Sequence, residues 1–170
     1  MMPTTKISIF MILALLLVSL SACSPKDEVL PAQNVDPDAA HASVTLDFEK
    51  QSGYATNQFA VWVEDAQGNL LQTLYATRFT AGGGYRDRPD AIPQWVKQSG
   101  IAAKSDGEVD AISGATPQTG SLTFLWDLKD QNGNTVPQGA YTFFVEGSLR
   151  WKNRVLYSGT ITVGDAAATQ

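Results

Sequence analysis

The chain has 170 residues and a formal net charge of −5, which suffices for one domain with a modest single core and short appendages. Its acidic residues are dispersed, and no basic stripe with interleaved aromatic residues occurs, so the composition argues against nucleic-acid binding. One Cys and one His exclude an intrachain disulfide and a Cys/His zinc site.

The N-terminus has the features of an export signal. Lys6 precedes an apolar run over residues 7–20, which is short and ends in small residues. A positive residue followed by such a run predicts a secretory signal peptide over residues 1–22 and not a transmembrane helix.

The end of this signal resembles the lipobox of bacterial lipoproteins, with the sequence LSAC at residues 20–23. The resemblance implies that Cys23 is acylated and anchors the mature protein on the periplasmic side of a bacterial membrane. Ser24 stands where an Asp favours inner-membrane retention, so the outer membrane is preferred. An ordinary signal peptide with an incidental Cys is the alternative. Residues 23–42 are rich in Pro, Asp and Ala, and we expect them to form a flexible tether.

Beyond the tether, short stretches alternate apolar and polar side chains with a period of two, which is typical of half-buried strands. The alternation predicts strands over residues 43–49, 58–64, 70–77, 122–127, 140–146 and 154–163. Gly and Asn mark turns at residues 65–69 and 130–134. Short strands with such turns predict an all-β fold, an immunoglobulin-like antiparallel β-sandwich over residues 43–165.

Residues 126–142 resemble a structural signature of Ig-like domains related to the flagellar-hook capping protein. They match its pattern W-D-x-x-D-x-x-G-x-x-V-P-x-G-x-Y-T. The resemblance supports the sandwich and implies that Trp126 caps the core. Tyr141 is expected to bury its ring while its hydroxyl finds a backbone partner. This motif is structural, and no chemistry follows from it.

The strand pattern is interrupted over residues 78–121, where no alternation survives and we expect a long irregular insertion. Pro93 permits one short helix, and Trp95 is expected to anchor it to the core. Three consecutive glycines at residues 82–84 predict a hinge or a close approach of backbone. No Walker lysine follows them, so we favour a flexible connection over a nucleotide-binding loop.

Within the insertion lies the stretch Asp110-Ala111-Ile112-Ser113-Gly114-Ala115-Thr116, expected as an exposed loop. It resembles the D-x-x-S/T-G-A-T motif of proteins to which an ApbE-type flavin transferase attaches FMN, taken from FAD, through a phosphoester. The resemblance implies that Thr116 is the acceptor and that the small Gly114 and Ala115 let the transferase approach the backbone. Asp110 would position the loop or the metal of the transferase.

The motif has one departure and one plainer interpretation. Ser113 fills the S/T position, but Pro117 follows the acceptor where flavin-carrying domains more often have a β-branched or small residue. Pro117 biases Thr116 towards an extended conformation. The alternative is an ordinary turn, in which Ser113 or Thr116 caps local backbone groups.

Other charged residues of the insertion carry little chemistry. Arg86 and Arg88 have two interpretations, as a grip for a phosphate or carboxylate and as surface partners of the neighbouring Asp residues. Glu108 and Asp110 are close in sequence and lack a supporting His, so we find neither a catalytic triad nor a carboxylate pair. A hydrolase is therefore disfavoured, and the resemblance to flavin-carrying proteins implies an electron carrier or accessory protein more than a stand-alone enzyme.

The order of features along the mature chain resembles a family of predicted periplasmic domains of unknown function. The features are residues 61–65, Gly68, residues 71–74, Trp95, residues 110–116, residues 126–127 and residues 137–141. Members tend to be encoded beside PepSY-type membrane reductases and ApbE-type flavin transferases, which implies extracytosolic electron transfer. The alternative is a non-catalytic Ig-like module that binds a protein partner or small ligand through residues 82–119.

Overall fold

A computed structural model describes residues 28–29, 36, 39–52, 57–150 and 153–164. The predicted signal peptide, the lipidation site Cys23 and most of the predicted tether lie outside the described residues. Glu28–Val29, within the predicted tether, forms strand β1 and pairs with a strand of the sandwich.

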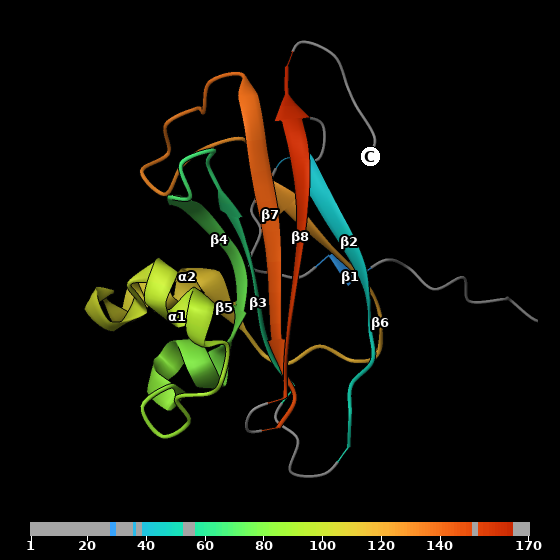
Figure 1. The fold of residues 1–170 in the computed structure, drawn as a ribbon, viewed down its shortest axis with the longest axis vertical. Coiled ribbons are helices and arrows are strands. Elements are labelled where there is room, and N and C mark those ends of the chain that lie inside the picture. The colour runs from blue at the N-terminus through green and yellow to red at the C-terminus, as the bar shows by residue number, and fades with distance from the viewer. Residues whose placement is uncertain (1–27, 30–35, 37–38, 53–56, 151–152, 165–170) are drawn as a thin grey trace, which may run out of the picture.

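The described strands form two sheets that pack face to face (Figure 1). One sheet has the order β1-β6-β2 and the other the order β5-β4-β3-β7-β8. After β1, their bounds are β2 Ala42–Phe48, β3 Gln58–Glu64, β4 Leu70–Thr77, β5 Ser113–Gly114, β6 Gly120–Trp126, β7 Gly139–Ser148 and β8 Arg154–Val163. The long strands pair antiparallel, whereas the two-residue strands β1 and β5 pair in parallel with β6 and β4. The predicted all-β sandwich is confirmed.

The space between the two sheets holds an inner core. Its buried members are Phe59, Val61, Val63, Leu74, Tyr75, Leu122, Phe124, Trp126, Tyr141 and Phe143. Trp126 is fully buried and its indole N–H donates to the Lys129 carbonyl at 2.7 Å. The Tyr141 ring is buried and its hydroxyl donates to the Pro137 carbonyl at 2.5 Å. Both roles expected for these two residues are confirmed.

A helical layer covers the outer face of the five-stranded sheet, on the side opposite the small sheet (Figure 1). It consists of a π-helical turn Thr80–Gly84, helix α1 Pro93–Ser99, a 3₁₀ turn Ile101–Ala103 and helix α2 Asp106–Ile112. The predicted helix at Pro93 is confirmed, but the prediction of an irregular insertion is wrong. Its apolar residues follow a helical period, so a search for alternation cannot detect them.

The helical layer buries a second, outer core against the sheet. Its buried members are Ala60, Trp62, Ala76, Ala81, Ile92, Trp95 and Ile101. Trp62 stacks on Phe144 with 5.2 Å between ring centroids, and Trp95 is fully buried, as expected for a core anchor. Every residue of β3 is consequently buried, because one face meets the inner core and the other the outer core. Among the described residues, no helix combines the length and apolar character required to cross a membrane.

The three glycines at residues 82–84 form part of the π-helical turn, not a flexible connection. A Cβ built on Gly84 would lie 2.5 Å from the Phe79 carbonyl oxygen, so the predicted close approach of backbone occurs there. Gly83 has φ of 110°, a conformation that favours glycine. The glycines let the chain turn sharply from β4 into the helical layer.

A buried carboxylate fastens the helical layer to the sheet. Glu146 on β7 is fully buried and accepts from the backbone N–H groups of Gln94 at 3.2 Å and Trp95 at 2.8 Å. These N–H groups belong to the first turn of α1, where helical amides lack partners within the helix. Arg154 Nε on β8 lies 3.1 Å from Glu146 Oε1. Burial raises the pKa of Glu146, while the two backbone hydrogen bonds and Arg154 act in the opposite direction.

Glu146→Gln is expected to lower the free energy of unfolding by about 1–3 kcal/mol, because both carboxyl oxygens can accept a hydrogen bond whether or not the group is protonated, whereas the amide nitrogen of Gln would face a backbone N–H without accepting from it. The raised pKa also sets a pH dependence. At pH values above 4.5, the ordinary pKa of this group, Glu146 ionises more readily in the unfolded chain than in the folded one. The contribution of Glu146 to the free energy of unfolding is therefore greatest below pH 4.5 and declines as the pH rises through the pKa of the folded protein. Urea unfolding of both proteins from acid to neutral pH measures the difference, and a constant difference would contradict the assignment.

Candidate functional site

Helix α2 carries the first half of the candidate motif and begins at a capping box. The Ser105 hydroxyl accepts from the Glu108 amide at 3.4 Å, while the Ser105 amide donates to Glu108 Oε2 at 2.9 Å. Hydrogen bonds from the Ser105 hydroxyl and amide hold the pKa of Glu108 below its ordinary value. Such reciprocal bonds satisfy amides that a helix start leaves free. The local sequence therefore fixes where α2 begins.

Asp110 lies in the last turn of α2, so the prediction that the whole motif is a loop is wrong. Its carboxylate Oδ1 lies 3.4 Å from Arg78 Nη1, and both side chains are more than half exposed. An exposed pair of this kind contributes little to stability. Asp110 and Arg78 are thus two accessible, opposite charges beside the motif.

The motif then joins the edge of the large sheet as strand β5. Ser113 pairs with Ala76 and Gly114 with Thr77, in parallel with the end of β4. Ser113 is only 5% exposed, and no described group bonds with its Oγ. The interpretation of Ser113 as a cap of local backbone groups is therefore wrong, and the buried hydroxyl is inaccessible to an enzyme.

Tyr75 of β4 holds the motif from the inner core. Its hydroxyl donates to the Ala115 carbonyl at 2.6 Å. A Cβ built on Gly114 would lie 2.9 Å from Tyr75 Cε2, so only glycine lets the strand lie this close to the ring. The smallness of Gly114 therefore serves packing within the fold.

Thr116 follows in irregular backbone and is half-buried. Among the described residues, no group forms a hydrogen bond with its hydroxyl, which distinguishes it from Thr119, whose Oγ1 accepts from the Lys50 amide at 3.0 Å. Pro117, the next residue, is buried. The structure thus brings the predicted residues into one continuous edge, with Thr116 at its accessible end.

These residues fit a phosphoester-linked group. A hydroxyl that has no hydrogen-bond partner can be esterified without breaking a hydrogen bond of the fold. Ser113 is buried and the Thr119 hydroxyl already accepts a hydrogen bond, so neither is as well suited to this reaction. Arg78 supplies an exposed guanidinium near the motif, and such a group suits a phosphate. No cluster of His, Cys, Asp and Glu suited to a metal ion occurs in the described part of the chain.

A polar cleft of about 690 Å³ lies next to α2 and is lined in part by the motif residues Ala111 and Ile112. Its walls come from the middle of β4, from α2 and from the loop that joins β6 to β7. Gln72 Oε1, in the β4 wall, is buried without a partner among the described residues. Sequence alternation places Gln72 on a strand but contains no signal for this cleft.

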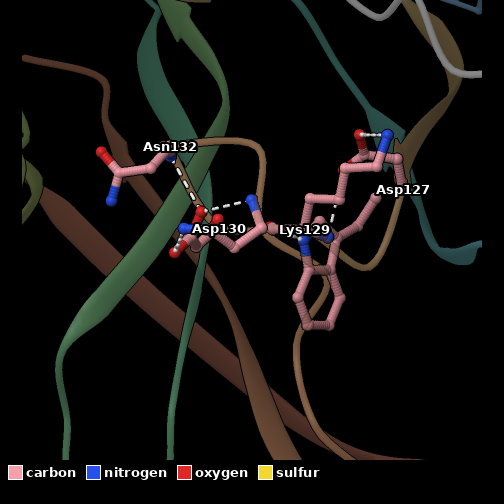
Figure 2. A network of polar contacts seen from close by, with 6 residues as sticks. Asp127, Lys129, Asp130 and Asn132 are labelled. Atoms are coloured by element: carbon pink, nitrogen blue, oxygen red, sulfur yellow. Dashed lines mark hydrogen bonds and ion pairs between the residues drawn. The ribbon is translucent and has the colours of Figure 1, made fainter.

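Hydrogen bonds within the turn brace the loop wall of the cleft (Figure 2). Asp130 Oδ1 accepts from the amides of Asn132 and Asn134, each at 2.9 Å. The side-chain and backbone donors of Asn134 hold the pKa of Asp130 below its ordinary value. The Gln131 amide donates to the Leu71 carbonyl at 2.8 Å, which fastens this turn to β4. The predicted turn at residues 130–134 is confirmed and the carboxylate has a structural role.

The two arginines of the insertion occupy different surroundings. The Arg86 guanidinium lies 5.2 Å from the centre of the Tyr85 ring. Arg88 donates from Nη2 to the Leu149 carbonyl at 3.4 Å. Burial lowers the pKa of Arg88, while the charge of Asp90 acts in the opposite direction. Among the described residues, neither arginine has an acidic partner within ion-pair distance.

The protein-family model described as "Predicted periplasmic protein (DUF2271)" matches residues 39–170, which is most of the chain. No curated protein and no solved structure matches the chain.

Gly114→Ala is expected to destabilise the domain by about 1–3 kcal/mol, because its Cβ would overlap the Tyr75 ring. Gly107→Ala is the matched control, since Gly107 lies in α2 and a Cβ added there would meet no atom within 4 Å. Alanine there is expected to stabilise the helix by about 0.5–1 kcal/mol. Thermal and urea unfolding of both variants measure the effects, and equal behaviour would contradict the packing role of Gly114.

Proposed function

The chain belongs to the DUF2271 family of predicted periplasmic proteins, and from that premise we propose that it is a lipid-anchored component of a flavin-linked electron-transfer system. In this proposal Thr116 carries covalent FMN. The protein is then an electron carrier whose cofactor an ApbE-type transferase attaches and a PepSY-type membrane reductase reduces.

The observation that carries the proposal is the state of Thr116. It is the one hydroxyl of the D-x-x-S-G-A-T stretch that is both accessible and without a hydrogen bond among the described residues. Ser113, the other hydroxyl of the motif, is buried in the sheet edge. The motif thus offers a transferase a single acceptor.

Attachment is a phosphoryl-type transfer from FAD. The Thr116 hydroxyl oxygen forms a bond to the phosphorus of the FMN half, the pyrophosphate bond of FAD breaks, and AMP leaves. The hydroxyl proton passes to a base of the transferase, and no electrons are exchanged. Asp110 and Arg78 lie where they can orient the transferase or the phosphate. Once attached, the flavin supplies reversible electron transfer.

Covalent attachment suits a protein outside the cytoplasm, where a dissociated flavin would diffuse away. The acylated Cys23 would hold the domain at a membrane, with the outer membrane preferred. A tether rich in Pro, Asp and Ala would let the domain move between a reductase and its electron acceptor.

The second candidate function is a non-catalytic binding module for a small ligand or protein partner. The polar cleft beside α2 favours it, because the cleft is large enough for a small ligand and contains the unpartnered Gln72 Oε1. A colourless protein that gains no flavin in the presence of a transferase would favour this alternative.

The principal test is the intact mass of the mature protein after co-expression with an ApbE-type transferase. We expect wild type to gain the mass of one FMN less one water, and Thr116→Ala to gain nothing, because the acceptor oxygen is gone. Thr116→Ser should retain the increment.

Thr119→Ala and Ser113→Ala are the matched controls, since each removes a nearby hydroxyl that the fold makes inaccessible or already uses. Both should retain the increment. An increment that persists in Thr116→Ala would exclude Thr116 as the acceptor.

Lipid anchoring predicts that the full-length protein partitions into detergent during phase separation, whereas Cys23→Ser remains in the aqueous phase. Acyl chains contribute about 0.8 kcal/mol per buried CH₂, so the shift in partition should be nearly complete. Equal partition of the two proteins would show that Cys23 carries no lipid.

A further inference from the structure

The backbone immediately before Thr116 is held by a side chain from a distant part of the sequence. The Tyr75 hydroxyl donates to the Ala115 carbonyl at 2.6 Å, across 40 positions of the chain. That carbonyl belongs to the peptide unit that continues into the Thr116 nitrogen. Because a peptide unit is planar, fixing its oxygen restricts the direction in which the Thr116 backbone leaves the sheet.

Tyr75 itself has little freedom. It is 1% exposed and its ring stacks on Phe59 with 5.0 Å between centroids. A second ring, Phe124, lies 5.7 Å away. The hydroxyl therefore comes from a rigid part of the inner core, and the bond transmits that rigidity to an accessible stretch of chain.

The same ring also sets the position of the preceding residue. Gly114 lies so close to Tyr75 that a Cβ would come within 2.9 Å of the ring, and its backbone pairs with Thr77 of β4. Two consecutive residues before Thr116 are thus held, one by ring contact and strand pairing and the other by the hydroxyl. Thr116 is the next and last residue of the motif, and its side chain forms no hydrogen bond within the described structure.

We propose that Tyr75 is a positioning residue for the modification of Thr116, so that the transferase receives its acceptor in a preformed conformation. This inference rests on the proposed function. Tyr75 touches none of the reacting atoms, since the new bond joins the Thr116 oxygen to phosphorus and AMP leaves. Because the bond fixes the direction of the Thr116 backbone, the hydroxyl keeps a reactive orientation within the complex with the transferase, which speeds the transfer step and not the binding.

The chain offers a matched control in Tyr141. This residue is also buried in the inner core, and its hydroxyl also donates to a backbone carbonyl, that of Pro137, at 2.5 Å. Neither Tyr141 nor Pro137 belongs to the motif. Replacement of either tyrosine by Phe keeps the ring and removes one hydroxyl bond of the same kind, so the cost in stability should be similar.

The experiment compares the mature wild-type protein with Tyr75→Phe and Tyr141→Phe, using a purified ApbE-type transferase and FAD. Intact mass over time, at several protein concentrations, gives kcat and KM for attachment, and thermal unfolding confirms that both variants are folded. For Tyr75→Phe we expect kcat to fall about threefold to tenfold with KM nearly unchanged, as for an interaction that matters in the transition state. Tyr141→Phe should react like wild type.

Each other outcome overturns the inference in a recognisable way. Equal rates for Tyr75→Phe and wild type would show that Tyr75 does not position the acceptor, while the proposed function stands. An equal loss in both variants, or a rise in KM alone, would show a general effect on folding, since a smaller folded fraction raises the apparent KM. Absence of FMN from wild type would overturn the proposed function and this inference together.

Discussion

The buried carboxylate of Glu146 is the interaction on which the arrangement of this domain depends. It lies on the outer face of β7, away from water, and it accepts two backbone hydrogen bonds from the start of α1. A buried carboxylate without such partners would destabilise the fold strongly. The helical layer therefore has one position against the sheet at which this charge is satisfied.

That position has consequences across the layer. With α1 held at β7, Trp95 fills the outer core and its indole N–H reaches Thr73 on β4 at 3.1 Å. The chain then returns along α2 and delivers β5 to the edge of β4. The candidate acceptor thus depends on a carboxylate that lies in a different strand and contacts none of the motif.

The short strand β5 joins the two cores at the motif. Ser113 pairs beside Ala76, which belongs to the outer core, while Gly114 lies against Tyr75 of the inner core. A motif that composition would describe as a small, flexible turn is therefore among the more constrained parts of the surface. This constraint ends at Thr116, which is consistent with an acceptor that must be both accessible and well oriented.

The sandwich could be predicted from the sequence, because the period-two alternation, the turn residues and the Trp126–Tyr141 signature are all local signals. The sequence also identified the motif, the helix at Pro93 and the core role of Trp95. The helical layer, the helical position of Asp110 and the burial of Ser113 could not be predicted in this way. The same holds for the hydrogen bonds from Tyr75 to Ala115 and from the start of α1 to Glu146. These contacts join positions far apart in the chain, and their energy comes from burial of groups that no local pattern records.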